Sequence, residues 1–392
     1  MKIDKRNPAH WAYLVRSGLA MVAAAALRPV LKRNEPATVL LYSHAFGGNL
    51  TALTDYAAKN IPGHYDFAFV GLDEAYLARL DDESHPGLRT LSMLRLRDTL
   101  QMARARAVVT DRNAVTLEIL KKLTSLPFID VWHGVPFKGF TEKNFRYLRD
   151  YTEVWVTGDG AAGLYVNQFG VPSPIVHSTG YARTDRLVNR DYDAVKLKAA
   201  YGIEESFDKI VLLAPTWKQD DSNRSIIPYG VAPEEFFEGL NKLGEANNAL
   251  IIFRAHLHVG GADAFTSYPY VRNMSNRDYP LIEEFLFLAD IVVTDWSSLA
   301  FDYLALERPT VFLDVAAPFK DGFSVPPEHR FGYHAANYAD FIDALRRYLS
   351  EPQSFADEYQ AAMDATREFI YGENLDGKTA KRQLARLANL LR

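Results

Sequence analysis

The chain of 392 residues contains no cysteine, which excludes disulfide bonds and thiolate zinc sites. It also lacks the basic surplus of a general nucleic-acid binder, because its formal net charge is −5. No apolar run reaches the ~20 residues that span a bilayer, and no short repeat is visible. With 48% hydrophobic and 24% charged residues, the chain is globular and long enough for two domains.

The start of the chain has an unusual pattern. An apolar run from Ser17 to Leu27 lies between Arg16 and Arg28, and Trp11 and Tyr13 precede it. Three interpretations are open: a peripheral helix at a membrane interface, a buried helix, or a secretory signal. The aromatic and basic flanks favour the peripheral helix, and the basic residues that continue after the run disfavour secretion.

From residue 35 onward, short apolar runs alternate with amphipathic stretches, which is typical of parallel strands covered by helices. We expect strands at 38–44, 66–72, 107–110, 128–132, 153–157, 174–179, 209–215, 249–256, 290–295 and 309–314. The helices between them include 91–106, 114–123, 233–244 and 281–289. A polar linker region from Asn189 to Asp208 separates the two series.

This pattern predicts an α/β fold with two doubly wound, Rossmann-like domains that face a central cleft. The predicted organisation is a helical, membrane-associated segment at 1–34, a Rossmann-like domain for the acceptor at 35–190, a second for the donor at 200–350, and C-terminal helices at 351–392 that cross over both domains.

The strongest local motif runs from Ala289 to Leu306. A buried strand ends at Asp295, and an apolar-periodic helix begins directly after Ser297 and Ser298. Serine is a preferred N-cap, and the first amides of a helix bind phosphate, so the capping and phosphate roles are compatible. Asp302, one turn further, either holds a sugar hydroxyl or pairs with a neighbour.

A second motif is "RAHLHV". If the strand that includes Ile251 continues to His258, then Arg254, His256 and His258 project from one face. Three cationic donors on one face suit a pyrophosphate. The His-x-His pair also fits zinc, although no third ligand is apparent.

Other candidate residues follow predicted strands, and ligands of parallel sheets bind at the carboxyl ends of the strands. They are His133, Gly134 and Lys138 after the strand at 128–132, Arg183 and Asp185 at the domain junction, and Thr216 and Lys218 after the strand at 209–215. A plain turn also explains the first group. The early segment "SHAFGGNLTAL" lacks the spacing of a dinucleotide-binding loop, so we expect it to shape the acceptor side or only a turn.

The segments "DVWHGVPFK", "LLAPTWK", "RAHLHV", "PLIEEFLFLADIVVTDWSSLAFDYLALERPTVFLD" and "DGKTAKR" occur in this order. As a set they resemble the CDP-glycerol glycerophosphotransferase family of teichoic-acid and related capsule synthesis. The resemblance runs from Phe128 to Asp314, with a short echo near Asp376 to Arg382. It departs from the family pattern at Val135, Phe137, Leu257, Trp296 and "GYARTD", which leaves the acceptor and the polyol open.

The resemblance implies a GT-B fold, a CDP-alcohol donor bound mainly in the C-terminal domain, no metal or other cofactor, and a peripheral position on the cytoplasmic face of the cell membrane. The implied reaction is attack of an acceptor hydroxyl on the β-phosphorus of CDP-glycerol, with release of CMP. The acceptor is a glycan or a lipid-linked molecule, and no nucleic acid takes part.

In that reaction we expect His133 to be the general base, because an imidazole titrates near neutral pH. The expected substrate-binding residues are Gly134, Lys138, Arg183, Asp185, Thr216, Lys218, Arg254, His256, His258, Thr294, Asp295, Ser297, Ser298 and Asp302. Three alternatives stay open: a GT-B glycosyltransferase or epimerase that uses a nucleotide sugar, a CDP-ribitol-specific transferase, and a non-catalytic membrane-associated binding protein.

Overall fold

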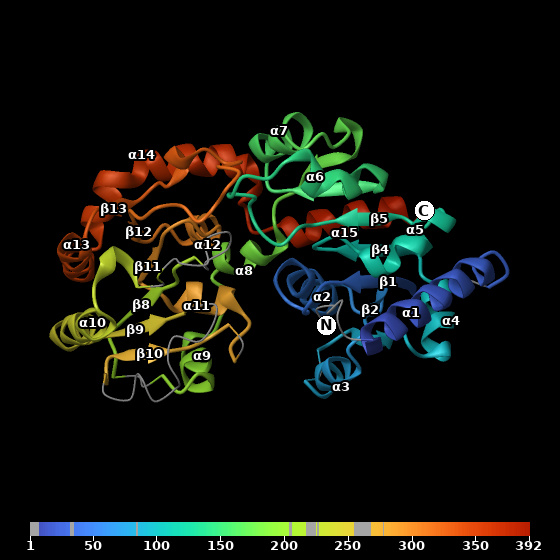
Figure 1. Cartoon of the computed structure of the whole chain (residues 1–392), viewed down its shortest axis with the longest axis horizontal. Coiled ribbons are helices and arrows are strands. Elements are labelled where there is room, and N and C mark those ends of the chain that lie inside the picture. The colour runs from blue at the N-terminus through green and yellow to red at the C-terminus, as the bar shows by residue number, and fades with distance from the viewer. Residues whose placement is uncertain are drawn as a thin grey trace.

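The computed structural model describes residues 8–31, 35–83, 85–203, 206–216, 225, 227–254, 268–276 and 278–392. Two α/β units lie side by side, each with a central sheet between helices (Figure 1). Every strand pair within the two sheets is parallel. This arrangement confirms the prediction of two doubly wound sheets.

The first sheet has seven strands in the order β3-β2-β1-β4-β5-β6-β7. They are β1 (Ala37–Tyr42), β2 (Tyr65–Gly71), β3 (Leu88–Ser92), β4 (Ala107–Thr110), β5 (Phe128–Asp130), β6 (Glu153–Val156) and β7 (Val176–Ser178). The strand order reverses between β1 and β4, where Leu40 pairs with Val108. Ligands of doubly wound sheets bind outside the carboxyl ends of the strands at such a reversal.

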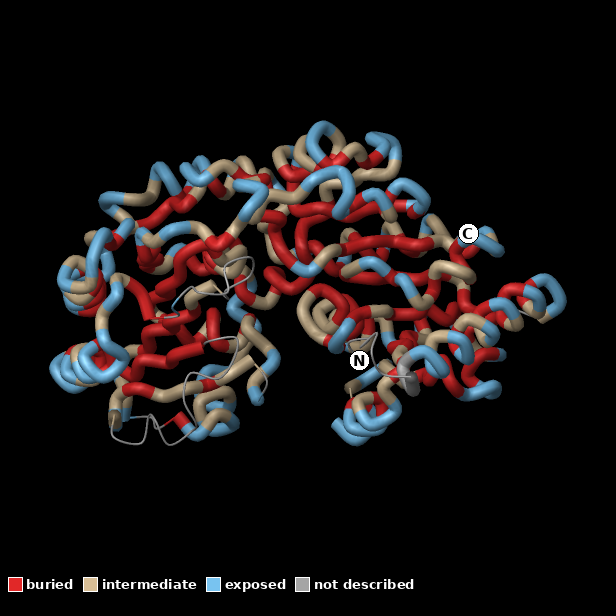
Figure 2. Tube along the Cα trace, in the orientation of Figure 1, coloured by how far each residue is buried: buried red, intermediate tan, exposed pale blue. Residues whose placement is uncertain are grey.

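Helices cover both faces of this sheet. One core contains side chains from α1 (Pro8–Leu27), α4 (Leu96–Ala103), α5 (Glu118–Leu123), α6 (Glu142–Phe145) and α7 (Asp159–Asn167). The opposite core contains side chains from α2 (Gly48–Asn60), α3 (Glu74–Asp82) and α15 (Thr379–Leu390). Because both faces are covered, inner strands such as β1 and β4 are buried almost throughout (Figure 2).

The second sheet has six strands in the order β10-β9-β8-β11-β12-β13. They are β8 (Lys209–Leu213), β9 (Ala249–Phe253), β10 (Val271–Asn273), β11 (Ile291–Thr294), β12 (Thr310–Leu313) and β13 (Tyr333–Ala335). Its helices include α9 (Ala194–Ala200), α10 (Pro233–Asn247), α11 (Ile282–Leu288), α12 (Leu299–Tyr303) and α13 (Tyr338–Ser350). The strand order reverses between β8 and β11, beside the first sheet's own carboxyl ends.

The last two helices connect the units. Helix α14 (Gln353–Ile370) packs against α13 of the second unit and α7 of the first. The chain then returns to the first unit, where α15 packs on α2 (Figure 1). The final residues of the chain therefore complete a core that begins near residue 37.

Several elements differ from the sequence prediction. The predicted helix at 91–106 is wrong at its start, because β3 occupies Leu88–Ser92 and α4 begins at Leu96. Strands β10 and β13, of three residues each, were not expected. Strand β9 ends at Phe253, so the predicted continuation to His258 fails for Arg254, which already lies outside the strand.

Helix α1 is buried on one face, as the interpretation of a buried helix expects, and exposed on another. Met21 and Ala24 are fully buried against the first unit, whereas Val15 and Leu19 on another face are 62% and 67% exposed. Among the described residues, no helix is both long enough and apolar enough to cross a membrane.

Candidate active site

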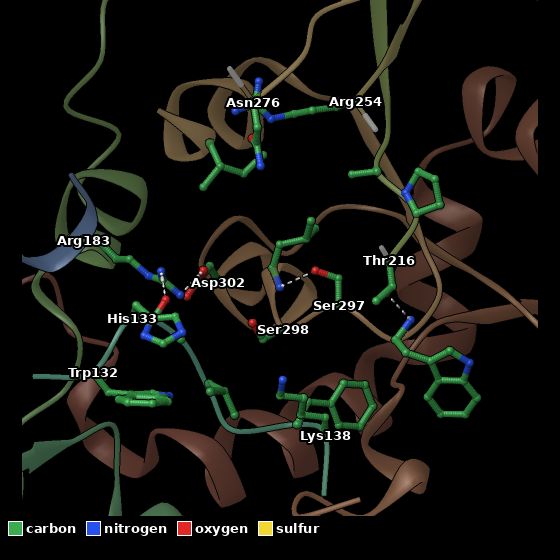
Figure 3. A pocket seen from close by; sticks show the side chains of 18 of the residues that line it. Trp132, His133, Lys138, Arg183, Thr216, Arg254, Asn276, Ser297, Ser298 and Asp302 are labelled. Atoms are coloured by element: carbon green, nitrogen blue, oxygen red, sulfur yellow. Dashed lines mark hydrogen bonds and ion pairs between the residues drawn. The ribbon is translucent and has the colours of Figure 1, made fainter. Parts of the chain in front are cut away.

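A cavity of about 390 Å³ lies between the two units, at the carboxyl ends of the strands. Figure 3 shows its side chains around an open space, with His133 and Arg183 on one side and Arg254 and Thr216 on the other. The described charged groups that line it are Lys138, Arg183, Arg254 and Asp302, in addition to His133. This set favours an anionic ligand.

His133 enters the cavity from the loop after β5. The preceding residue, Trp132, has φ of 44°, a left-handed backbone conformation that costs a bulky residue free energy and is found at functional sites. The His133 Nδ1 atom lies 2.9 Å from the Asp111 carbonyl oxygen. Because a carbonyl only accepts, Nδ1 carries the proton, and Nε2 is the nitrogen that can accept one.

The environment of His133 favours the neutral imidazole. Desolvation by the surrounding protein, followed by the charge of Arg112, lowers the pKa of His133 to about 4. Solvent still reaches the ring through the cavity, so we take the direction of the shift as the result. At neutral pH the ring is therefore unprotonated and can act as a base.

The His133 loop is also attached to the second unit. Gly139 donates from its backbone N–H to the Gly322 carbonyl at 2.6 Å, and Ser324 donates in return to the Phe137 carbonyl at 3.0 Å. A Cβ atom on Gly139 would lie 2.0 Å from the Asp321 carbonyl oxygen, so only glycine fits this approach. Lys138 lies between these two contacts, and its ammonium group lies over the Phe140 ring.

Gly134 allows a second close approach. A Cβ atom at this position would lie 3.0 Å from the Ser298 Oγ atom. Ser298 precedes α12, and its side chain makes no capping hydrogen bond to that helix. Ser297 does accept a bond from the Leu299 N–H, at 3.4 Å. Both serines line the cavity, which fits the predicted phosphate site.

Arg183 joins the two units at the cavity wall. It lies in the short 3-10 helix Ala182–Thr184, donates from Nη1 to the His133 carbonyl at 2.7 Å and pairs through Nη2 with Asp302 at 2.6 Å. Burial is the largest single influence and would lower the pKa of Arg183, but the charges around it, Asp302 and Glu283 foremost, together raise that pKa above its usual value. Of the two expectations for Asp302, pairing with a neighbour is the one that the structure displays.

Arg254 and Thr216 form the wall that belongs to the second unit. Arg254 donates to the carbonyl oxygens of Met274 and Tyr279, and its guanidinium carbon lies 4.6 Å from the centre of the Phe285 ring. Burial lowers the pKa of Arg254 to about 10, so the side chain remains a cation at neutral pH. Thr216 lines the cavity after β8.

Three predicted site residues lie outside the cavity lining. Thr294 donates to the Ala214 carbonyl at 2.7 Å, and Asp295 accepts from the backbone N–H groups of Thr216 and Trp296. Asp185 accepts from the N–H groups of the first two residues of α15. In the structure these side chains support the ends of β11, β8 and α15, and their expected contact with the donor stays a prediction.

Lys218, His256 and His258 lie outside the described residues. The pyrophosphate and zinc interpretations of the His-x-His pair therefore stay predictions. Within the part of the chain that the structure describes, no cluster of three or more potential metal-ligating side chains occurs.

Two buried residues at the site were missed by the sequence analysis. Asn49, at the start of α2, donates to the carbonyls of Val131 and Trp132. Tyr371, between α14 and α15, donates to Asp302 at 3.2 Å. The "GGN" turn after β1 was a signal for Asn49, but its partners are 82 to 134 positions away. We found no sequence signal for Tyr371.

Two doubly wound sheets whose strand ends face one another across a cationic cavity define a GT-B-like protein. The sequence matches the family model described as CDP-glycerol:poly(glycerophosphate) glycerophosphotransferase over residues 23–387. The chain belongs to this family, which confirms the resemblance.

Curated relatives are about a quarter identical to this chain over the aligned residues. The teichoic acid ribitol-phosphate polymerase TarL of Staphylococcus aureus is 24% identical over 69% of this chain, and the alignment spans 51% of that relative, about half its length. A teichoic acid glycerol-phosphate transferase of the same species is 25% identical over 79% of this chain and 83% of its own.

Solved structures include a variant of the wall teichoic acid polymerase TagF. Its TM-score is 0.74 at 18% identity, with 96% of this chain and 97% of that chain covered. This likeness confirms the predicted GT-B-like fold.

Proposed function

We propose that the protein transfers a polyol-phosphate unit from a CDP-polyol, CDP-glycerol in the first instance, to a hydroxyl of a glycan or lipid-linked acceptor in the synthesis of a teichoic-acid-type or capsule polymer, and releases CMP. The observation that carries this proposal is the composition of the cavity. It places a neutral histidine beside three cationic side chains, and its one described carboxylate is already paired with Arg183.

In the proposed reaction the acceptor hydroxyl attacks the β-phosphorus of the donor. Nε2 of His133 takes the hydroxyl proton as the new O–P bond forms. The bond between the β-phosphorus and the bridging oxygen breaks, and CMP leaves with that oxygen. Lys138, Arg183 and Arg254 stabilise the phosphate charge, so the proposal uses the protein's own cations and no metal or other cofactor.

The two serines before α12 complete the donor site in this proposal. Their hydroxyl groups face the cavity, and a hydroxyl can donate a hydrogen bond to a phosphate oxygen. Thr216 at the end of β8 supplies a further polar contact on the same side. A CDPG soak is described for crystals of a TagF variant, which supports CDP-glycerol as the first donor to test.

The polyol is the finer point of the proposal. Similar proteins include both ribitol-phosphate and glycerol-phosphate enzymes, so we propose glycerol first and ribitol as the second candidate. The two donors differ in chain length but carry the same pyrophosphate, which the cavity's cations would bind in either case.

The experiment is CMP release by the purified protein given CDP-glycerol or CDP-ribitol, with and without an oligosaccharide or lipid-linked acceptor. We expect acceptor-dependent release, and His133→Ala should reduce kcat by about 10²- to 10⁴-fold while donor binding persists. Ser298→Ala is the matched variant on the second unit and should weaken donor binding instead.

Other outcomes separate the alternatives. Full activity of a folded His133→Ala variant would refute the role of the base. Activity with UDP-sugars but not with CDP-polyols would identify a nucleotide-sugar enzyme, and nucleotide binding without turnover would identify a binding protein.

We also propose a peripheral position on the inner face of the cell membrane. The apolar layer of α1, α4 and α5 supports this: Trp11, Tyr13, Val15, Leu19, Val22, Val30, Leu96, Leu100, Val115 and Leu123 are ten of the eleven large apolar side chains exposed in the described residues. Helix α1 contains Arg16 and no acidic residue, and Arg97 on α4 is 88% exposed. Apolar side chains among basic ones fit an anionic lipid surface.

A further inference from the structure

The turn that begins α2 has no part in the proposed chemistry, yet it contains a fully engaged polar side chain. Asn49 is 2% exposed. Its Nδ2 atom donates to the Val131 carbonyl at 3.1 Å and the Trp132 carbonyl at 2.9 Å. Its Oδ1 atom accepts from the Arg183 backbone N–H at 3.2 Å. Two carbonyls require the amino group and one N–H requires the oxygen, so the partners fix the amide orientation.

These bonds hold a backbone conformation that would otherwise be unfavourable. Left-handed backbone at a bulky residue such as Trp132 is unfavourable and persists only where the surroundings enforce it. The Trp132 N–H donates to the Asp130 carboxylate at 2.9 Å, and Asn49 binds the Trp132 carbonyl. Both ends of Trp132 are therefore fixed, and its conformation directs the next residue, His133.

Arg183 closes a ring of contacts around the same loop. Asn49 holds the Arg183 backbone, and the Arg183 guanidinium holds the His133 carbonyl at 2.7 Å. The Trp132 carbonyl thus depends on Asn49 directly, and the His133 carbonyl depends on it through Arg183. The same guanidinium pairs with Asp302 of the second unit, so the ring also relates His133 to α12.

The glycine directly before Asn49 makes this position possible. Gly48 has φ of 54°, a conformation that glycine adopts readily, and Gly47 is the N-cap of α2 without a capping side chain. Together they start the helix directly under the His133 loop.

We propose that Asn49 is a positioning residue for the transfer reaction, which fixes the Trp132–His133 loop so that Nε2 of His133 faces the acceptor hydroxyl. The inference rests on the proposed role of His133 as the base. Asn49 itself is buried beneath the loop, is absent from the described cavity lining and acts through the position of His133.

A kinetic double-mutant cycle tests this role. The kcat for CMP release is measured at saturating donor and acceptor for the unmodified protein, Asn49→Ala, His133→Ala and the double variant. Because a misplacement near 1 Å can cost about 10²-fold, we expect Asn49→Ala to lower kcat about 10- to 100-fold with little change in donor KM. In the His133→Ala background, Asn49→Ala should have no further effect on kcat.

The controls keep a positioning role apart from a general loss of fold. Thr54 lies in the same helix, is 1% exposed and bonds only to carbonyls of α2, so Thr54→Val should leave kcat and donor KM unchanged. If Asn49→Ala does not fold, Asn49→Asp retains the acceptor for Arg183, removes both donors and takes its place in the cycle.

Each outcome has a distinct meaning. If removal of the Asn49 amide lowers kcat equally in the unmodified protein and in His133→Ala, Asn49 does not act through His133. That outcome would overturn this inference but leave the proposed function intact. Unchanged kcat in a folded Asn49→Ala variant would overturn it as well. Full activity of His133→Ala would instead overturn the proposed base, and the inference with it.

Discussion

At the scale of single residues, the site depends on the protonation state of one imidazole. Its Nδ1–H is held by the Asp111 carbonyl, and desolvation lowers the pKa of His133 to about 4. A donor with two phosphates brings negative charge, which favours the imidazolium form and raises this pKa in the bound complex.

A pH profile checks this difference. The base must be unprotonated, so activity falls as the pH drops through its pKa. We expect the acid limb of kcat/KM, which reports the free enzyme, to lie below the usual pH range of an imidazole, and the limb of kcat to lie at a higher pH. Stopped assays of CMP release over a pH series measure both. A kcat limb at or below the kcat/KM limb would contradict the assignment.

The sequence predicted those site residues whose role is visible in local pattern. Short strands followed by His133, Ser298 or Thr216 point to the carboxyl edge of a parallel sheet, and the structure brings these three to one cavity. The bonds from Asp185 to α15 were not foreseen, because its partners there are 194 and 195 positions away. Asn49 was missed for the same reason, since local pattern contains no information about such contacts.

At the scale of elements, long buried strands were easier to predict than short edge strands. Strand β1 is an unbroken apolar run, whereas β3 contains Arg89 and is only partly buried. Edge strands receive less of the apolar signal because one side pairs with no neighbour. The prediction consequently merged β3 into the helix that follows it.

Asp185 gives an element-scale prediction. Its carboxylate accepts from the N–H groups of Thr379 at 2.9 Å and Ala380 at 2.7 Å, so it satisfies the open start of α15. Asp185→Ala should destabilise the protein by about 1.5–3 kcal/mol, the value of a hydrogen bond to a charged group. Thermal unfolding measures the loss. Asp185→Asn keeps one acceptor, so its stability should lie between those of the unmodified protein and Asp185→Ala.

The same variant tests the expected contact of Asp185 with the donor. Below its unfolding transition, Asp185→Ala should bind CDP-glycerol as the unmodified protein does. Weaker binding by the intact protein would return Asp185 to the border of the donor site.

At the scale of the whole molecule, exposed apolar side chains concentrate on one helical layer at the far side of the first unit from the second. Val15 on α1 and Val195 on α9 are both 62% exposed, which makes them a matched pair. Val15→Asp should reduce co-sedimentation with vesicles that contain phosphatidylglycerol, because it places a carboxylate against the lipid surface. Val195→Asp should not.

Vesicle composition supplies the second control. Binding should weaken with neutral phosphatidylcholine and at high salt, since the basic residues contribute through charge. Equal effects of the two valine substitutions would exclude the apolar layer as the lipid-binding surface.

The return of the chain to its first unit has a consequence for biosynthesis. Leu384 and Leu387 of α15 belong to the core that also contains Val39 and Leu41 of β1. At about 5–20 residues per second, translation needs roughly 17–70 s to reach α15 after β1 has been made. The first sheet emerges from the ribosome early, but during this interval only α2 and α3 cover that face, and the part that α15 covers stays open to chaperones. A nascent chain released before α15 would consequently leave the core of the first sheet unfinished.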